Sequence, residues 1–572
     1  MFILSLLTSG VCVSQTYPRN YFRSPMDITL RLSGNFGELR PNHFHAGIDI
    51  TTQGVEGLTV RASADGYVSR IKISPWGYGK AVYVTHPNGY TTVYAHLSDY
   101  SGAIGDWVEN QQYLAQSFEV DLYPTAGELP VIKGQEIAKS GNTGGSGGPH
   151  LHFEIRDSQT EEAINPLLFG LPIADAVAPT PVTLAVYASQ DGSYVNATSR
   201  MKKSAFVKSG NKYVLQNSAD SIVVYGSIGF GVEAYDKESI PQGKNGVYGI
   251  RLQEGDKIIY EHHLERIAFE DSRYVNCFVD YAEHERNGKY FQLSFLQPNN
   301  LLPVYDTTVD RGFVVLNDGK YHKFNYTVYD AYGNKSVAEF KVKALSKLPE
   351  AKYAATEVSP YVQVLLWDKP NRIEENDFTF ETPERSVYDN TTFKWTSKKG
   401  SAQRLSSVIT INDRFIPLHK ACTLTIAMPS TTRANEQLVM IREKSNGGVT
   451  SVGGKWNGNG VSAEIKEFGS YAVMRDSIAP TIKPANYDKG GKTENDFSAM
   501  KTIDVKIGDN LSGIQAYRGT IDGKWVLFEY EPKKDLLRYT YDSHVGKGSH
   551  ILTITVTDKC GNMSVYTKTF TR

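Results

Sequence analysis

Two pairs of short segments recur far apart in this 572-residue chain, and they constrain its architecture more than any other feature. The segment "VYDAYGNKSV" at 328–337 matches "VTDKCGNMSV" at 556–565 through the pattern Asp-x-x-Gly-Asn-x-Ser. Likewise, "DAVAPT" at 175–180 matches "DSIAPT" at 476–481. Each pair brackets a stretch that is rich in Val, Ile, Thr and Tyr, the residues that favour strands. The recurrence predicts two related β-sandwiches of immunoglobulin-like type.

The remaining chain also favours strands over helices. It holds 50 Gly and 35 Tyr against only 8 Met, and alternating apolar residues run through 54–95. We therefore expect a mainly β protein with an antiparallel β-sheet domain followed by immunoglobulin-like β-sandwiches. The expected divisions are a signal peptide at 1–15, the first β domain at 16–172, a β-sandwich at 173–346, a β-rich domain of unknown type at 347–475 and a second β-sandwich at 476–572.

The N-terminus predicts export. A short apolar run, Phe2 to Leu7, precedes small residues near Ser14, as in a signal peptide, although a basic start is missing. Cys12 raises a lipoprotein alternative, which the preceding Val11 disfavours. No later run is apolar enough to span a bilayer, so we expect no transmembrane segment in the mature chain. The net charge of −1 gives no global field for nucleic acid. The expected location is the periplasm, the cell envelope or the extracellular space.

Histidines cluster near the start of the chain. Six of the thirteen lie between His43 and His152, and two of these stand one residue apart in "GGPHLHFEIR". Side chains at i and i+2 of a strand point to one face, so His150 and His152 look into the same space. His45 and Asp49, in "HFHAGIDI", share a face if that segment is extended.

Two histidines with a carboxylate form a common zinc set, because a catalytic zinc takes three protein ligands and leaves one position for water. His96, in "VYAHL", ends a predicted strand and could reach the same pocket. The spacing alone leaves open which histidine of the His-x-His pair would bind the metal.

Four segments together resemble the lysostaphin/LytM-type zinc metallopeptidases, which cleave peptide cross-links of bacterial peptidoglycan. They are "HAGID", "ASADGYVSRI", "YAHL" and "SGNTGGSGGPHLHFEI", in that order, and the resemblance covers about residues 30–170. It implies a small antiparallel β domain with a groove across it. It also implies that His45, Asp49 and His152 are zinc ligands. His96 and His150 would then be the catalytic pair that orients the water, accepts its proton and stabilises the tetrahedral intermediate.

Several further residues are candidates for the surroundings of this site. The glycine loop would let an extended peptide bind along it, unless it is only a flexible turn. The segment 97–130 holds six acidic residues and no Lys or Arg, and it would form a lid, a groove wall or a loop packed elsewhere. The motif "YEHHLER" is expected not to bind metal, because His262 and His263 face opposite sides of a strand. The groove candidates are Gly144, Gly145, Gly147 and Tyr94, and His43 is a candidate for contact with the ligands.

The predicted function is an exported, zinc-dependent endopeptidase that hydrolyses stem or cross-link peptides of peptidoglycan. Two alternatives remain open: a non-catalytic regulator of cell-wall hydrolases, or an envelope scaffold or adhesin that acts through its β-sandwiches. These β-sandwiches are also candidates for contacts with other envelope proteins. In the repeated segments, Asp330 and Asp558 are expected to serve turn geometry, with calcium binding as the alternative.

Overall fold

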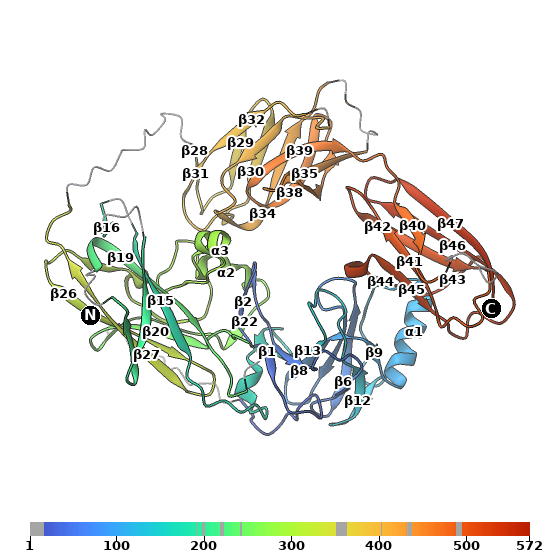
Figure 1. Ribbon diagram of the computed structural model, residues 1–572, viewed down its shortest axis with the longest axis horizontal. Helices are drawn as coiled ribbons and strands as arrows, with labels where there is room; N and C mark the ends of the chain where they lie inside the picture. Colours follow the sequence, from blue (N-terminus) through green and yellow to red (C-terminus); the bar gives the residue numbers. More distant parts are fainter. Residues whose placement is uncertain are drawn as a thin grey trace, which may run out of the picture.

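The computed structural model is mainly β, as predicted, and its domains follow one another around a ring (Figure 1). It describes residues 17–189, 192–196, 201–217, 222–240, 243–349, 363–401, 403–430, 432, 437–487 and 495–572. The predicted signal peptide lies outside the described residues. Four large hydrophobic cores succeed one another along the chain, and a fifth joins the first domain to the second.

The first domain is built on a large antiparallel sheet with the strand order β1-β4-β13-β8-β7-β6-β10, beside a smaller sheet of the order β5-β12-β9. Its elements are β1 (Leu32–Gly34), β2 (Leu39–Arg40), β3 (His43–Phe44), β4 (Ile48–Thr51), β5 (Thr59–Arg61), β6 (Gly66–Ile73), β7 (Lys80–Thr85), β8 (Tyr90–Leu97), β9 (Asp99–Tyr100), α1 (Ala103–Ala115), β10 (Val120–Leu122), β11 (Pro130–Val131), β12 (Glu136–Lys139), β13 (His150–Asp157), β14 (Ala163–Ile164) and the short helix η1 (Pro166–Phe169).

Apolar and polar residues alternate along β13, so one face of the large sheet packs on the core and the other carries polar side chains. Leu151, Phe153 and Ile155 are fully buried in the first core. The intervening side chains, which begin with His150 and His152, therefore lie on the opposite face. An apolar residue at every second position thus fixes the strand on the core and presents polar groups on the other side.

The second domain shares a sheet with the first. Its strand β22 pairs with β14, and Arg266 on β22 bonds Asp157 and Glu162 at 3.0 and 2.7 Å. Its elements are β15 (Thr180–Ala188), β16 (Tyr194–Val195), β17 (Met201–Ser209), β18 (Lys212–Leu215), β19 (Ile222–Tyr235), β20 (Gly249–Glu254), β21 (Lys257–His263), β22 (Arg266–Ile267), η2 (Ser272–Tyr274), α2 (Val275–Phe278), α3 (Tyr281–Asn287), β23 (Gln292–Leu293), β24 (Tyr305–Thr308), η3 (Val309–Gly312), β25 (Val314–Leu316), β26 (Tyr321–Tyr329) and β27 (Lys335–Ala344).

The third domain has two five-stranded sheets, and the fourth has two four-stranded sheets. The third comprises β28 (Gln363–Leu365), β29 (Asn371–Glu374), β30 (Phe378–Thr382), β31 (Thr391–Phe393), β32 (Trp395–Lys398), β33 (Val408–Ile411), β34 (Pro417–Ala427), β35 (Leu438–Glu443), β36 (Val449–Gly453), β37 (Lys455–Trp456), β38 (Gly460–Glu467) and β39 (Gly469–Arg475). The fourth comprises β40 (Thr481–Pro484), β41 (Thr502–Gly508), β42 (Ile514–Ile521), β43 (Lys524–Trp525), β44 (Phe528–Glu531), η4 (Pro532–Lys534), β45 (Leu536–Thr540), β46 (Ser549–Asp558) and β47 (Met563–Thr571).

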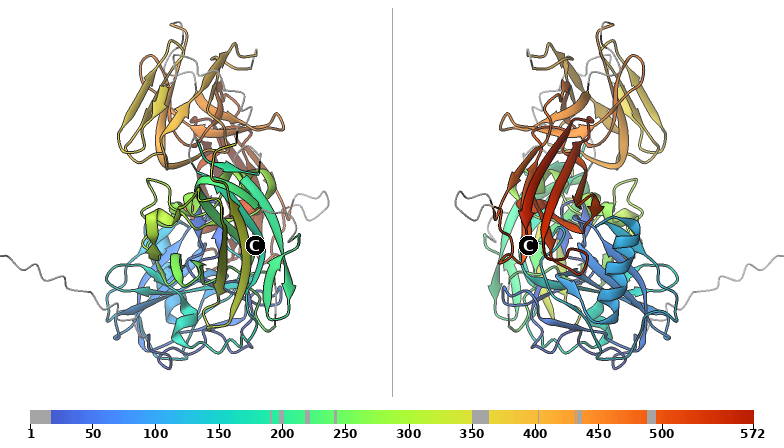
Figure 2. Two further views of the ribbon diagram at one scale, coloured as in Figure 1. Left: turned by 90° about the vertical axis from the view of Figure 1, so that its left-hand side faces the viewer. Right: turned by 90° about the vertical axis from the view of Figure 1, so that its right-hand side faces the viewer.

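The fourth domain returns to the first and closes the ring, beside α1 (Figures 1 and 2). Tyr113 of α1 stacks on His544, with ring centroids 3.7 Å apart, and its hydroxyl bonds Asp542. Lys80 forms an ion pair with Glu529 at 2.8 Å. The acidic segment 97–130 therefore contributes the helix on which the fourth domain docks, which is a contact that the sequence did not reveal.

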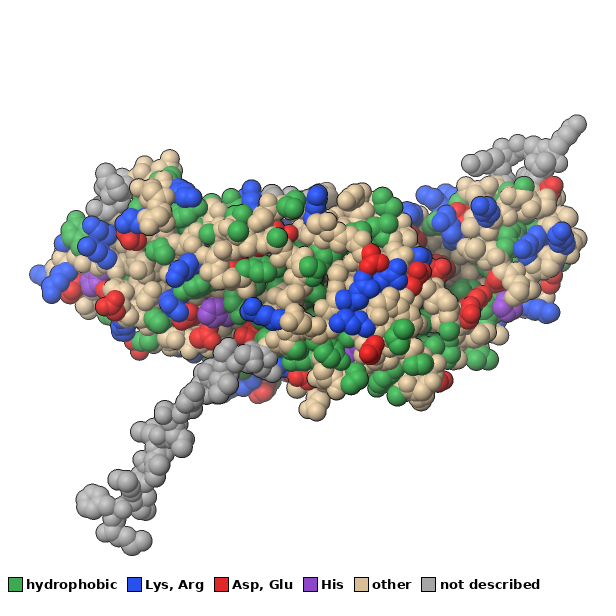
Figure 3. All heavy atoms as spheres, turned by 90° about the horizontal axis from the view of Figure 1, so that it is seen from below, with side chains coloured by type: hydrophobic (Ala, Val, Ile, Leu, Met, Phe, Trp, Pro, Cys, Tyr) green, Lys and Arg blue, Asp and Glu red, His purple; other side chains and the backbone are tan. Residues whose placement is uncertain are grey.

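The outer surface carries charges of both signs. Seen from below, Lys and Arg are interspersed with Asp and Glu over the face in view (Figure 3). Within the described part of the chain, no helix has both the length and the apolar character needed to cross a membrane.

Candidate metal centre

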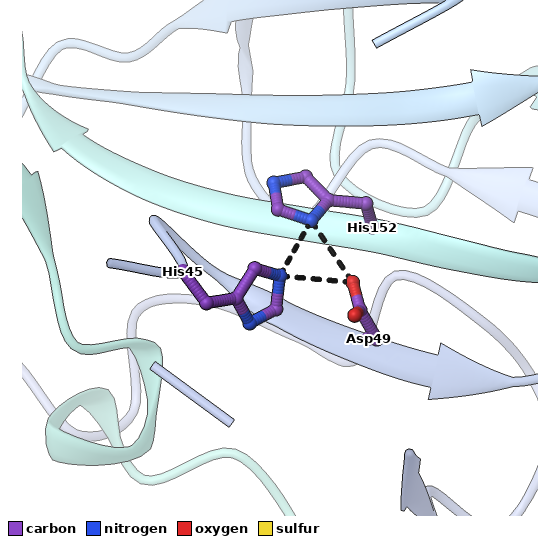
Figure 4. Close-up of side chains that lie close together, drawn as sticks. All are labelled: His45, Asp49 and His152. Atoms are coloured by element: carbon purple, nitrogen blue, oxygen red, sulfur yellow. Dashed lines mark hydrogen bonds and ion pairs between the residues drawn. The ribbon is translucent and has the colours of Figure 1, made fainter. Parts of the chain in front are cut away.

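Three side chains converge on the polar face of the large sheet (Figure 4). The Nε2 atom of His45 lies 2.9 Å from Nδ1 of His152, and each of these nitrogens lies 3.0 Å from Oδ1 of Asp49. All three residues are buried. One carboxylate oxygen and two imidazole nitrogens therefore point at a common centre.

Strand register brings these residues together. His152 on β13 pairs directly with Asp49 on β4, and His45 lies just before β4. Gly47 allows the approach, because a Cβ atom at this position would lie 2.4 Å from the carbonyl oxygen of Phe153. Any larger residue at 47 would separate the two strands.

Hydrogen bonds at the far side of each ring fix which nitrogen faces the centre. His45 donates from Nδ1 to the carbonyl oxygen of Asn35 at 2.8 Å, which leaves the Nε2 lone pair directed inward. His152 contacts Oε1 of Glu154 through Nε2 at 2.8 Å, which leaves Nδ1 directed inward. A partner on the outer nitrogen is the usual arrangement of a metal-binding histidine.

Asn35 lies upstream of these residues and does not cover the centre. Its side-chain amide bonds the backbone of Gly246 in the second domain at 2.8 and 2.9 Å. Only its carbonyl oxygen turns toward the site, where it holds His45. Asn35 therefore supports the centre from outside rather than blocking it.

The electrostatics of the three residues suit a cation. Burial alone would raise the pKa of Asp49, but His45, His150 and His152 hold it well below its usual range. Burial opposes the charged form of His152, yet Asp49 and Glu154 raise its pKa to about 9. Burial lowers the pKa of His45. The site thus stabilises one positive charge between an ionised carboxylate and a neutral imidazole, and a His₂Asp donor set is one that suits a zinc ion whose fourth ligand is water.

His96 and His150 line the same pocket. The Nδ1 atom of His96 donates to the carbonyl oxygen of Thr143 at 2.9 Å, and Nδ1 of His150 donates to that of Gly148 at 2.9 Å. Nε2 of His150 lies 3.3 Å from Oδ1 of Asp49, and the His96 and His150 ring centroids are 4.8 Å apart. Burial and the neighbouring histidines lower the pKa of His96 to about 3. Both rings are therefore held by backbone carbonyls, which leaves the opposite nitrogens free for chemistry.

The backbone conformation of β8 places His96 on the polar face of the sheet and Tyr94 on the opposite face. Strict alternation would place both residues on the same side of β8. His96, however, adopts a φ of 58°, in the left-handed region, which turns its side chain toward the histidines. Tyr94 stays in the core, fully buried, with its hydroxyl accepting from Ser63 N at 2.8 Å. The prediction that Tyr94 lines the groove is therefore corrected.

The three glycines predicted to line the groove, and His43, differ in their surroundings. Gly144 has a φ of 69°, and a Cβ atom there would lie 2.3 Å from the backbone of Gly79. Gly145 donates to the carbonyl oxygen of Gly77 at 2.7 Å, whereas a Cβ atom on Gly147 would meet open space. Two of the three glycines thus serve loop-to-loop packing. His43 is exposed, with Nδ1 against the carbonyl oxygen of Pro41, away from the centre.

Two charged residues at the site were missed from the sequence. Arg40 binds Oδ2 of Asp49 at 2.6 Å, which leaves Oδ1 for the centre. Glu154 is fully buried and bonds Arg156 at 2.6 Å as well as the hydroxyl of Tyr78. The alternation that places His150 and His152 on one face extends to Glu154 and Arg156, so this pair could have been found. Arg40 reaches the site from a separate hairpin and had no such signal.

The "YEHHLER" motif does not form a metal site. His262 is fully buried against Phe278, whereas His263 bonds Asp306 on the other side of β21. Among the described residues, neither histidine belongs to a cluster that could hold an ion. The two side chains diverge as strand geometry predicts.

Comparison with known proteins places the first domain in a family. The model of "Peptidase family M23" matches residues 43–124 and 125–166, and that of the "Zu5-like domain" matches 362–476. The chain is 34% identical over 165 residues to "DD-carboxypeptidase/endopeptidase Mpg" of Neisseria meningitidis serogroup B, covering 28% of this chain and 31% of that protein. It is 30% identical over 165 residues to "Peptidoglycan DD-endopeptidase ShyA" of Vibrio cholerae, covering 28% and 32%.

These matches span about a third of the length of the curated relatives. Among solved structures, the catalytic domain of the antimicrobial peptidase lysostaphin from Staphylococcus simulans is 24% identical, covering 24% of this chain and 91% of that one, with a TM-score of 0.19. The residues that match the family model include His45, Asp49 and His152. The N-terminal part of this chain is therefore an M23 peptidase domain of the lysostaphin/LytM type, and a Zu5-like domain follows it toward the C-terminus.

Proposed function

We propose that the chain is an exported zinc-dependent endopeptidase that hydrolyses stem or cross-link peptides of peptidoglycan. The observation that carries the proposal is the convergence of His45, Asp49 and His152 on one point, with His96 and His150 beside it. A bound zinc would lower the pKa of its water to about 7 and so supply hydroxide at neutral pH. The curated relatives, whose names specify DD-peptidase activity, favour bonds between D-amino acids as the class of substrate.

Each residue has a role that its contacts support. His45, Asp49 and His152 would hold the ion. His150, whose Nε2 faces Asp49, would accept the proton of the attacking water and deliver it to the leaving amine. His96, neutral because of its low pKa, keeps its Nδ1 proton on the carbonyl oxygen of Thr143, so its inward nitrogen presents a lone pair that would accept a hydrogen bond from the attacking water and orient it.

The surrounding contacts would orient these groups. Asn35 and Glu154 fix the rings of the two histidine ligands, and Arg40 occupies the second oxygen of Asp49. Such supporting contacts hold reacting groups in position before the substrate arrives. Retention of all five residues favours an enzyme over the non-catalytic regulator. We place its action in the cell envelope, where peptidoglycan lies.

A substrate assay on the full chain tests the proposal. Protein freed of metal and then given zinc is incubated with purified peptidoglycan that carries DD cross-links, and with peptidoglycan joined by glycine bridges. We expect zinc-dependent release of uncross-linked peptides from the first substrate. Asp49→Asn, which keeps the side-chain shape, should bind zinc poorly and release none. Zinc-loaded protein that cleaves neither substrate would overturn the proposal in favour of the regulatory alternative.

A further inference from the structure

The repeated segments described above build two similar clusters of carboxylates. Asp175, Asp236 and Asp330 lie at the junction of the first and second domains, and one oxygen of each lies within 4.8 Å of the others. Asp476, Asp509 and Asp558 form the same arrangement at the junction of the third and fourth domains. In each cluster, one aspartate precedes the first strand of a β domain, and another ends or directly follows the penultimate strand of that domain.

The hydrogen bonds of the two clusters match in detail. Oδ1 of Asp330 accepts from Tyr332 N and Asn334 N, and Oδ2 accepts from the Asn334 amide at 2.7 Å. Oδ1 of Asp558 accepts from the residues at the same spacings, Cys560 N and Asn562 N, and Oδ2 accepts from the Asn562 amide at 2.7 Å.

The asparagine also ties each cluster to its linker. The Asn334 amide lies 3.4 Å from the carbonyl oxygen of Asp175, and the Asn562 amide lies 2.8 Å from that of Asp476. Turn geometry accounts for these bonds and so for the expectation from the sequence. It does not account for the third aspartate of either cluster.

Some carboxylate oxygens in the clusters have no partner. Asp236 is 5% exposed and Asp476 is 1% exposed, and Oδ1 of each is buried without a hydrogen bond. Oδ1 of Asp509 is likewise buried and unpaired. Among the ion pairs within the described ranges, none includes a Lys or Arg with any of the six aspartates. Buried carboxylates that face one another without a counter-ion are costly, because each must lose its hydration.

A cation would remove that cost. Calcium takes six to eight oxygen ligands, mostly carboxylates, carbonyls and water, whereas zinc prefers nitrogen and sulfur. The clusters offer only oxygen. By contrast, the group Glu109, Asp542 and His544 is largely exposed, and Asp542 already accepts from Tyr113 and Tyr539. That group lacks the buried unpaired oxygens and carries no such argument.

We propose that each of the two clusters binds a calcium ion that fastens a linker to the β domain that follows it. At the first junction, a series of hydrogen bonds would also connect the ion to the proposed zinc centre. Asp236 pairs through its backbone with Asn245, and the next residue, Gly246, holds the side chain of Asn35, whose carbonyl oxygen orients His45. Calcium at the first cluster would thus stabilise the loop behind one of the proposed zinc ligands.

Calcium binding to the full chain tests the proposal without any measurement of activity. Zinc-loaded protein is dialysed against calcium-free buffer and then titrated with calcium by calorimetry, and thermal unfolding is followed with and without calcium. We expect two calcium ions per chain and a rise in the unfolding temperature. Asp236→Asn and Asp476→Asn should each lower the number bound from two to one. Asp256→Asn, at an exposed turn of the second domain, should leave it at two.

The variants also separate a metal site from a purely structural cluster. Without calcium, Asp236→Asn should unfold at a higher temperature than the unsubstituted chain, because it removes one of three facing charges. If the cluster binds no ion, added calcium should leave the unfolding temperature of the unsubstituted chain unchanged, whereas a bound ion should raise it more in the unsubstituted chain than in Asp236→Asn. A chain that binds no calcium at millimolar concentration, or variants that still bind two ions, would overturn the proposal. Because the unsubstituted chain is titrated too, a variant that fails to fold leaves the test intact.

Discussion

Glu154 offers a quantitative test of how the proposed zinc site is supported. Its carboxylate is fully buried between Nε2 of His152, at 2.8 Å, and the guanidinium of Arg156, at 2.6 Å. Burial would raise its pKa, but Arg156 and His152 lower it to about 2, so it is ionised at any working pH. Glu154→Gln keeps the shape of the side chain and removes the charge.

Two separate losses follow from this substitution. Removing the partner of a metal-binding histidine typically weakens metal binding roughly 10- to 100-fold, so zinc affinity should fall by at least about tenfold. Leaving the buried Arg156 without its partner should cost about 3–5 kcal/mol of folding free energy. Glu161→Gln is the matched control, because Glu161 is 68% exposed and lies 3.5 Å from the same guanidinium. It should change neither quantity measurably.

Zinc competition with a chromophoric chelator and denaturant unfolding measure the two effects on the same samples. The double variant Glu154→Gln with Arg156→Met removes the unpaired charge and should recover most of the stability but not the zinc affinity. If Glu154→Gln binds zinc as tightly as the unsubstituted chain, the argument from ring orientation fails. If the double variant recovers full affinity, Glu154 acts only through folding.

Further predictions concern parts of the chain away from the ligands. His262 is fully buried, and burial lowers its pKa to about 3. As the pH falls below about 6.5, this histidine therefore takes up a proton in the unfolded chain but not in the folded one. The free energy of unfolding of the second domain should fall by about 1.4 kcal/mol per pH unit, or by about 2 kcal/mol at pH 5. His262→Leu should flatten this dependence in denaturant unfolding at pH 8 and pH 5, and an unchanged slope would contradict the assignment. Tyr113→Ala should weaken the docking of the fourth domain by about 1–2 kcal/mol through the lost stack and hydrogen bond, seen as faster hydrogen exchange in β44. Leu114→Ala, at a 79% exposed neighbour, should not change it, and equal exchange in both variants would refute the contact's importance.

Much of this structure could be predicted from the sequence, because it follows from the residue pattern of single strands. Alternation along one strand predicted that His150 and His152 share a face, and the structure places them so. The mainly β fold followed from composition and from the repeated segments. The assignment of His45, Asp49 and His152 as zinc ligands, and the distinction between His150 and His152, came from the family resemblance and stay predictions.

Other features could not be predicted from the pattern of a single strand, because they depend on the folded structure. The left-handed backbone at His96 breaks the alternation along β8, so His96 faces the site while Tyr94 is buried in the core. Arg40 approaches Asp49 from a different hairpin, and Asn35 is held by the second domain. The role of α1 depends on the return of a domain some 400 residues later in the chain. These features depend on how separate segments meet in the folded chain, or on a single backbone conformation, and not on the residue pattern of one strand.

The most direct test of the proposed centre combines zinc content and peptide release on the same samples. The full chain, His45→Ala and His150→Ala are purified in zinc, dialysed, analysed for metal and incubated with cross-linked peptidoglycan. The account predicts one zinc per chain and cleavage for the unsubstituted protein, neither for His45→Ala, and zinc without cleavage for His150→Ala. Stoichiometric zinc in His45→Ala, or full cleavage by His150→Ala, would contradict it.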